Sequence, residues 1–351
     1  MNSRERVERC LNRKKPDRLP IRHLATDEID EVLLNYFGTH DNNEVLNEIG
    51  CDFRDIRPEL TEHCGYSIDN RKLIISCVVW NMAVSNAMSG KLPLADVTDI
   101  SNIPADAFIK PDVFDYSILP DECAKYEEHI RIFGYSEFDF INGISALRGN
   151  EQVLIDIATL ERVYLDLIYK RFEFAMEHIE LALKTCKGKI DIVSFGDDFG
   201  SQRGLLISPQ SYKTIFEPLY REGFALAHKY GAKTMLHCCG SNRDLIGDFI
   251  DTGLDILDVI QTDAARMDLE GLKEEFGNDI IFAGSMSVQK LIPFGTREQV
   301  RTEARKRAMM FNDGGLIYGP SHVLQPDSVL DNILEMYGSI LGRDISISHV
   351  E

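Results

Sequence analysis

Five short apolar runs recur in the C-terminal half of the chain, and each is followed by a segment with helical periodicity. The runs are residues 190–198, 232–239, 254–261, 279–285 and 314–322. Short, nearly continuous apolar runs joined by helical crossovers are typical of parallel strands that are buried on both faces. The pattern therefore predicts a parallel sheet covered by helices, with a final helix from about Asp327 to Leu341.

Five strand–helix units in succession favour a (β/α)8 barrel of the TIM type over a doubly wound sheet. No GxGxxG motif precedes a predicted helix, which also argues against a Rossmann fold. Four glycines lie where helices are expected to pass into strands, as C′ glycines do: Gly231, Gly253, Gly277 and Gly314.

The N-terminal half has a less regular pattern. Residues 72–84 and 131–142 predict strands, whereas residues 26–70 and 85–130 predict helical and loop insertions. No linker or internal repeat divides the chain. We therefore predict one α/β barrel domain over residues 1–351, in which 1–130 form an elaborated N-terminal part and 190–345 carry the regular units and the site.

Composition narrows the class of protein. The chain has 351 residues, 44% of them hydrophobic, and 38 Lys and Arg against 57 Asp and Glu give a net charge of −19. This balance argues against nucleic acid or an anionic membrane as the main partner. No apolar run approaches membrane-spanning length, the first 20 residues lack the apolar core of a secretory signal, and the eight cysteines are scattered. We expect a soluble cytoplasmic protein with reduced thiols.

The most informative chemistry lies at the end of the second run, in the sequence AKTMLHCCGSNRDL. Because strand side chains alternate between faces, His237 and Cys239 are predicted to project to the same side and Cys238 to the other. An imidazole and a thiol at the end of a buried strand make half of a zinc site. A buried thiol beside a hydrogen-bonded histidine is the alternative interpretation.

In a TIM barrel the active site lies at the C-terminal ends of the strands. The polar residues at the ends of the five runs are Asp197, Asp198, His237, Cys239, Gln261, Ser285, Ser321 and His322. If the barrel closes, His322 can face His237 and Cys239 across the mouth, despite the long stretch of chain between them. Three protein ligands and one open position are the pattern of a catalytic zinc.

The two adjacent aspartates are expected to point to opposite sides. One is predicted to cap the loop 199–204, and the other to ligate the metal, bind the substrate or act as a base. Asp198 is our candidate catalytic residue and Asp197 a candidate substrate-binding residue. Gln202 in the following loop, with Gln261 and Ser285, is predicted to line the substrate pocket.

Four segments resemble the uroporphyrinogen decarboxylase superfamily, and within it the cobalamin-dependent methyltransferases. They are KKPDRLPI near the start and residues 196–212, 228–261 and 319–333. The resemblance implies a (β/α)8 barrel with its pocket at the C-terminal mouth. In the methyltransferase branch a His-x-Cys pair and a later cysteine bind zinc. His237 and Cys239 match the pair, and His322 stands where the branch has the cysteine.

The decarboxylases of this superfamily carry an arginine-rich N-terminal loop that binds the substrate carboxylates. The matching stretch here is RHLATDEIDE, which is acidic and has only Arg22. The resemblance therefore implies a zinc-dependent methyltransferase that moves a methyl group between a corrinoid, methylcobalamin on a partner protein, and a small thiol or similar acceptor. The alternatives are a metal-free decarboxylase and a non-catalytic corrinoid- or tetrapyrrole-binding protein.

Overall fold

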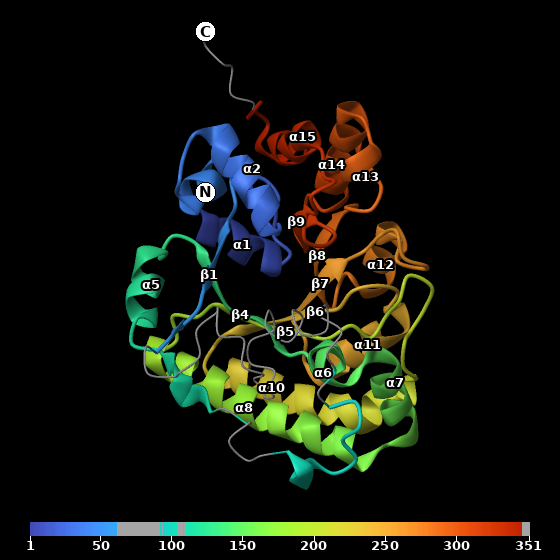
Figure 1. Ribbon diagram of the computed structural model, residues 1–351. Coiled ribbons are helices and arrows are strands. Elements are labelled where there is room, and N and C mark those ends of the chain that lie inside the picture. The colour runs from blue at the N-terminus through green and yellow to red at the C-terminus, as the bar shows by residue number, and fades with distance from the viewer. Residues whose placement is uncertain (62–91, 93, 104–107, 109, 346–351) are drawn as a thin grey trace.

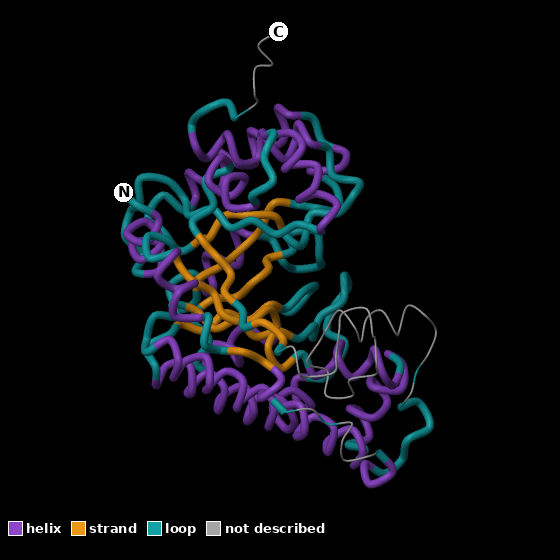
Figure 2. Tube along the Cα trace, turned by 60° about the vertical axis from the view of Figure 1, so that its left-hand side comes forward, coloured by secondary structure: helices purple, strands orange, loops and turns teal. Residues whose placement is uncertain are grey.

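A parallel, strongly curled sheet forms the centre of the molecule (Figures 1 and 2). The computed structural model describes residues 1–61, 92, 94–103, 108 and 110–345. The seven sheet strands follow the order β1-β4-β5-β6-β7-β8-β9. Their bounds are β1 Phe53–Ile56, β4 Ile130–Phe138, β5 Ile192–Gly196, β6 Lys233–His237, β7 Ile256–Ile260, β8 Ile281–Met286 and β9 Leu316–Pro320. The five strands predicted in the C-terminal half are confirmed.

A short extended segment around Ile21 closes the sheet into a barrel. Ile21 forms parallel bridges both to Cys51, next to β1, and to Tyr318 in β9. The Tyr318 N–H donates to the carbonyl of Pro20 at 2.7 Å, and the Asp52 N–H donates to the carbonyl of Ile21 at 2.8 Å. The Ile21 segment thus takes the place of an eighth strand between the two edges, as a TIM-type barrel requires.

Helices surround the sheet, as Figure 1 shows. Those of the N-terminal half are α1 Ser3–Leu11, α2 Asp27–Phe37, α3 Asn42–Glu48, α5 Leu119–Lys125, α6 Phe140–Arg148, α7 Asn150–Thr159 and α8 Arg162–Cys186. Those of the C-terminal half are α9 Pro209–Ser211, α10 Glu217–Lys229, α11 Arg243–Thr252, α12 Leu269–Phe276, α13 Leu291–Phe294, α14 Arg297–Met310 and α15 Leu330–Leu341. A π-helical turn, Tyr212–Phe216, joins α9 to α10, and among the described residues no helix is long and apolar enough to span a membrane.

Local sequence explains where several helices begin and end. Thr296 and Gln299 form a capping box that begins α14, because each side chain accepts from the other's backbone N–H. Gly231, Gly253 and Gly314 adopt positive φ after helices, as predicted, whereas Gly277 has φ −62° and stays right-handed. All four glycines nonetheless lie between a helix and the strand that follows it, as predicted.

The N-terminal half differs from the prediction in several places. Two short antiparallel strands, β2 Glu59–Leu60 and β3 Phe114–Asp115, lie within the predicted helical and loop insertions. β1 lies within residues 26–70, where we expected only helices and loops. Its alternation is obscured by Arg54, which is buried because it donates to the carbonyls of Cys51 and Phe53 and to the side chain of Asn47. The predicted strand 131–142 ends at Phe138, and α6 begins at Phe140. The predicted strand 72–84 lies outside the described residues.

Burial is complete along the later strands. Every residue of β7, β8 and β9 is buried, because the barrel interior covers one face and helices cover the other. Aromatic rings fill the layer between the sheet and α10, where Phe138 packs on Phe195 and Tyr220. A β-carbon on Gly223 of α10 would lie 2.4 Å from the Phe138 ring, so glycine there permits close helix–sheet packing.

Asp52 holds the closing segment in place. Its carboxylate is fully buried and accepts from Arg6 at 2.6 Å, from Arg18 at 2.8 Å and from the Ile21 N–H at 2.8 Å. Removing one partner of a buried ion pair leaves an uncompensated charge.

We therefore expect Asp52→Ala to lower the free energy of unfolding by about 3–5 kcal/mol, measured by urea denaturation. The exposed Asp279→Ala variant is the matched control and should change stability by less than about 0.5 kcal/mol. Equal stability of the two variants would show that Asp52 does not secure the barrel closure.

Candidate metal centre

Three potential metal ligands converge at the C-terminal mouth of the barrel. His237 is the last residue of β6, Cys239 follows two residues later, and His322 lies two residues beyond β9. One ligand atom from each lies within 4.8 Å of the other two. We call His237, Cys239 and His322 the metal trio. Among the described residues, no other group of three or more His, Cys, Asp and Glu side chains comes as close.

The spacing within the metal trio suits a tetrahedral zinc ion. Zinc bonds of about 2.0–2.3 Å place neighbouring ligand atoms roughly 3.3–3.7 Å apart in a tetrahedron. Cys239 Sγ lies 3.2 Å from His237 Nε2, and the two imidazole rings have centroids 5.6 Å apart at 69°. An imidazole, a thiol and a second imidazole are donors that zinc prefers, and three ligands leave a fourth position for a substrate.

A carboxylate behind His237 fixes the orientation of its ring. Asp258 in β7 contacts His237 Nδ1 at 3.1 Å, and Arg22 pairs with the same carboxylate at 2.9 Å. Burial lowers the pKa of His237, but Asp258 outweighs this and raises it above its ordinary value. Burial likewise opposes ionisation of Asp258, yet Arg22 and His237 bring its pKa to about 2. The contact leaves Nε2 facing Cys239, the arrangement found in carboxylate–histidine–metal triads.

Asp198 positions the backbone of the metal trio. One carboxylate oxygen accepts from the N–H of Cys239 and the other from the side chain of Asn142, both at 2.8 Å. Asp198 thus links the strand end that carries Cys239 to helix α6. Its predicted catalytic role stays a prediction, but its side chain does line the cavity described below.

Asp197 holds the start of a helix. Its two oxygens accept the N–H groups of Phe140 and Ile141, at 3.0 and 2.7 Å, in the first turn of α6. Burial is the main reason that its pKa rises to about 7. The prediction that one of the two aspartates caps the 199–204 loop was wrong, because Ser201 does so by hydrogen bonds to Gly204.

A cavity of about 150 Å³ opens beside the metal trio. Its walls contain both histidines of the trio, Asp197 and Asp198. The remaining lining residues are Arg22, Leu24, Asp139, Asn142, Ser194, Asp258 and Val323. This cavity is the natural place for a substrate that reaches a bound metal.

The other three predicted substrate-binding residues do not line this cavity. The Gln202 side chain donates to Gln261 at 3.2 Å, and Gln261 also accepts the N–H of Gly240 at 2.9 Å. The Ser285 hydroxyl accepts from Arg307 at 3.0 Å. The glutamines thus join loops at the strand ends, and Ser285 joins β8 to α14. The role of all three towards a substrate stays a prediction.

The two adjacent cysteines differ as strand alternation predicts. Cys238 is fully buried among core residues, whereas Cys239 is half-buried beside His237. Burial raises the pKa of both thiols, in Cys239 well above the usual range. A metal cation reverses this effect, because a coordinating thiol is deprotonated. Cys239 is therefore the thiol that could hold a metal here, and Cys238 packs in the core.

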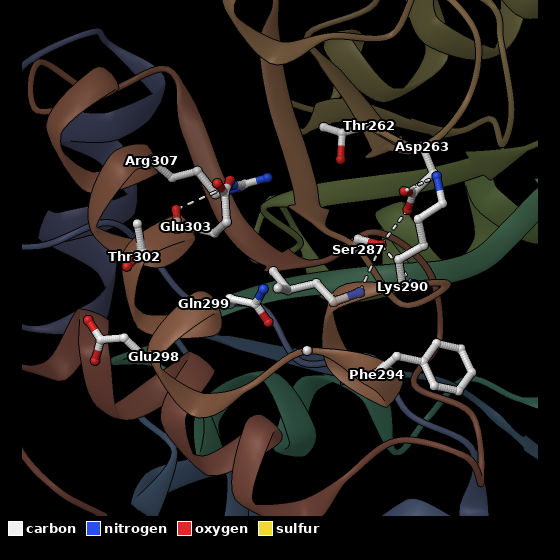
Figure 3. A pocket seen from close by; sticks show the side chains of 12 residues that line it. Thr262, Asp263, Ser287, Lys290, Phe294, Glu298, Gln299, Thr302, Glu303 and Arg307 are labelled. Carbon is white, nitrogen blue, oxygen red and sulfur yellow. Dashed lines mark hydrogen bonds and ion pairs between the residues drawn. The ribbon is translucent and has the colours of Figure 1, made fainter.

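A larger cavity of about 520 Å³ lies between the ends of β7 and β8 and the helices α13 and α14 (Figure 3). Four of its charged groups pair with one another, and Glu298 pairs with Arg301 outside the lining. Lys290 lies 3.2 Å from Asp263, and Arg307 pairs with Glu303. The metal trio is not among its lining residues.

Four residues of the site were not predicted from the sequence. They are Asp139, Asn142, Asp258 and, as the partner of Asp258, Arg22. The signal for Asp258 is present in LDILDVIQ, where a carboxylate interrupts an otherwise apolar, fully buried strand. A buried carboxylate needs a partner, so its position near the strand end points towards the mouth.

Comparison with known proteins agrees with this fold. The family model "Uroporphyrinogen decarboxylase (URO-D)" matches residues 155–340, more than half of the chain, and the protein therefore belongs to that family. No curated protein matches the chain. Among solved structures, a methyltransferase from Methanosarcina mazei superposes with a TM-score of 0.63 at 15% identity, covering 97% of this chain and 99% of that one. That likeness shows a shared fold.

The geometry predicts different effects for the two adjacent cysteines. Cys239→Ala should abolish tight zinc binding, because it removes one of three ligands. Cys238→Ala should retain it and lose only some stability from the core. Elemental analysis after dialysis against micromolar zinc measures both. Equal zinc loss in the two variants would contradict the assignment of Cys239 as the ligand.

Proposed function

We propose that this protein is a zinc-dependent methyltransferase that moves a methyl group between a corrinoid on a partner protein and a thiol or similar small acceptor. The observation that carries the proposal is the convergence of the metal trio at the barrel mouth, beside a cavity that its two histidines line. Membership of the URO-D family and the fold likeness to a methyltransferase support it.

The residues of this chain have separate roles in the proposal. His237, Cys239 and His322 hold the zinc, which supplies Lewis-acid activation of the acceptor thiol when bound. Asp258 orients His237, and Asp198 orients Cys239. The ligand set has one thiolate and two neutral imidazoles, so it neutralises less of the ion's charge than two thiolates would. An acceptor thiol bound there ionises more readily for that reason.

The corrinoid is assigned to a separate protein in this proposal. The described elements form the barrel and the helices around it, and the metal trio lies at one open end of that barrel. A partner that docks on this end brings its methyl-cobalt group to the cavity. The small-molecule acceptor occupies the cavity itself.

Decarboxylation of uroporphyrinogen fits the cavity less well. Four aspartates line it, and its one arginine, Arg22, is already paired with Asp258. A tetrapyrrole with many carboxylates needs unpaired cations to bind, since a buried charge without a partner is costly. This contrast supports the proposal of methyl transfer over decarboxylation.

The test combines metal content with two reactions. Protein purified without chelator should hold about one zinc per chain and should demethylate methylcobalamin when thiols are supplied, and chelator should stop the reaction. Uroporphyrinogen III, incubated anaerobically with the same protein, should yield no coproporphyrinogen at an enzyme-like rate. Decarboxylation by zinc-free protein would overturn the proposal and favour the decarboxylase alternative.

Asp198→Asn should reduce methyl transfer far more than stability. An asparagine offers one acceptor where the carboxylate offers two, so either the Cys239 N–H or Asn142 loses its partner. We expect zinc affinity to fall by about 10–100-fold, the usual effect of losing an outer-shell contact. Melting temperature, zinc affinity and transfer rate are compared. A lowered melting point beside an unchanged rate would remove Asp198 from the site.

A further inference from the structure

One carboxylate oxygen of a residue that lines the cavity has no hydrogen-bond donor. Asp139 lies between β4 and α6, is 3% exposed and lines the cavity next to the metal trio. Its Oδ2 atom is buried and accepts no hydrogen bond. The nearest cation is Arg171, whose Nη2 atom lies 4.0 Å from Oδ2, beyond hydrogen-bond range. A buried carboxylate oxygen left in this state is costly unless a ligand supplies the donor.

The other carboxylates of the cavity are already satisfied. Asp258 contacts Arg22 and His237. Asp197 accepts two backbone N–H groups of α6, and Asp198 accepts the Cys239 N–H and the Asn142 amide. Of the described buried polar atoms that lack a partner, Asp139 Oδ2 is the one that belongs to a residue of this cavity. The missing donor is therefore specific in position. Burial raises the pKa of Asp139 well above its ordinary value, and a cationic donor would stabilise the charged carboxylate.

The charge of the cavity selects the sign of its ligand. Its lining carries four aspartates against one arginine and two histidines. An anionic ligand would meet this excess of negative charge in a space of about 150 Å³ with little water to screen it. A cation with N–H donors would instead complete Asp139 and reduce repulsion among the carboxylates.

We propose that the cavity binds a small substrate bearing an ammonium group, with its N–H groups donating to Asp139 while the rest of the molecule extends towards the metal trio. No aromatic ring other than the two imidazoles is among the described lining residues. The site therefore suits a primary or secondary ammonium, which donates hydrogen bonds, better than a quaternary one, which prefers aromatic faces. That this ligand is the methyl acceptor rests on the function proposed above.

Three thiols of similar size and different charge test the inference on the unaltered protein. They are cysteamine (cationic), 2-mercaptoethanol (neutral) and mercaptoacetate (anionic), each titrated by calorimetry into the zinc-loaded protein. We expect cysteamine to bind at least about tenfold more tightly than 2-mercaptoethanol, the scale of one charge-assisted hydrogen bond, and mercaptoacetate to bind most weakly. Equal affinities, or tightest binding of mercaptoacetate, would overturn the proposal.

Variants locate the ammonium group. Asp139→Asn should remove the preference for cysteamine and leave 2-mercaptoethanol binding unchanged, while the exposed control Asp279→Asn should retain the preference. Should Asp139→Asn fail to fold, the charge series on the unaltered protein still decides. A full preference for cysteamine in folded Asp139→Asn would show that the ammonium group lies elsewhere and would overturn the assignment.

Ethylammonium, which has no thiol, separates this inference from the proposed function. It should bind to zinc-loaded and to chelator-treated protein alike, because Asp139 is not one of the metal ligands. Binding of ethylammonium without any methyl transfer would refute the proposed function and leave the ammonium site standing. Methyl transfer without ethylammonium binding would support the proposed function and refute the ammonium site.

Discussion

Closure of the barrel by the Ile21 segment is the constraint on which the rest of the structure depends. The hydrogen-bonded strands leave one gap, and Ile21 fills it through bridges to both edges. Asp52 holds the segment in place by accepting the N–H of Ile21. Arg22 follows directly in the chain, so closure delivers its guanidinium to Asp258, which in turn orients His237. The same contacts that complete the fold therefore complete the support of the candidate metal centre.

The mouth of the barrel is built from carboxylates that each have a separate structural task. Asp197 anchors α6, Asp198 anchors the Cys239 backbone, and Asp258 anchors a histidine ring. Because their donors come from different elements, the network connects the ends of β5 and β6 with β7 and α6. These contacts hold the His237 ring and the Cys239 backbone in place without help from a substrate, as preorganised sites require.

Local patterns in the sequence predicted what local physics determines. The apolar runs identified β5 to β9, and strand alternation separated Cys239 from Cys238. The barrel hypothesis also brought His322 to His237, because parallel strand ends meet at one edge. Long-range contacts could not be predicted in this way. Asp197 accepts the N–H of Ile141 in α6, more than 50 residues earlier in the chain. No feature of the sequence around Asp197 indicates that partner.

The N-terminal errors have the same origin. Arg54 in β1 is a charged residue, and its buried contacts with a carbonyl and with Asn47 cannot be seen in the sequence. The strand was therefore predicted as part of an insertion. Asp258 was missed for the same reason, because its partners Arg22 and His237 come from distant parts of the chain. In both cases a buried charged side chain depends on groups that only the folded chain supplies.

The position of the closing segment also has a consequence for the order of assembly. Ile21 is made long before its partner Tyr318, and His322 follows Tyr318 by only a few residues. Contacts between such distant parts of a chain form late in folding. The emerging polypeptide carries His237 and Cys239 well before it can offer a third ligand. The proposed zinc site can therefore be completed only after His322 has been made, and the Cys239 thiol has to remain reduced until then.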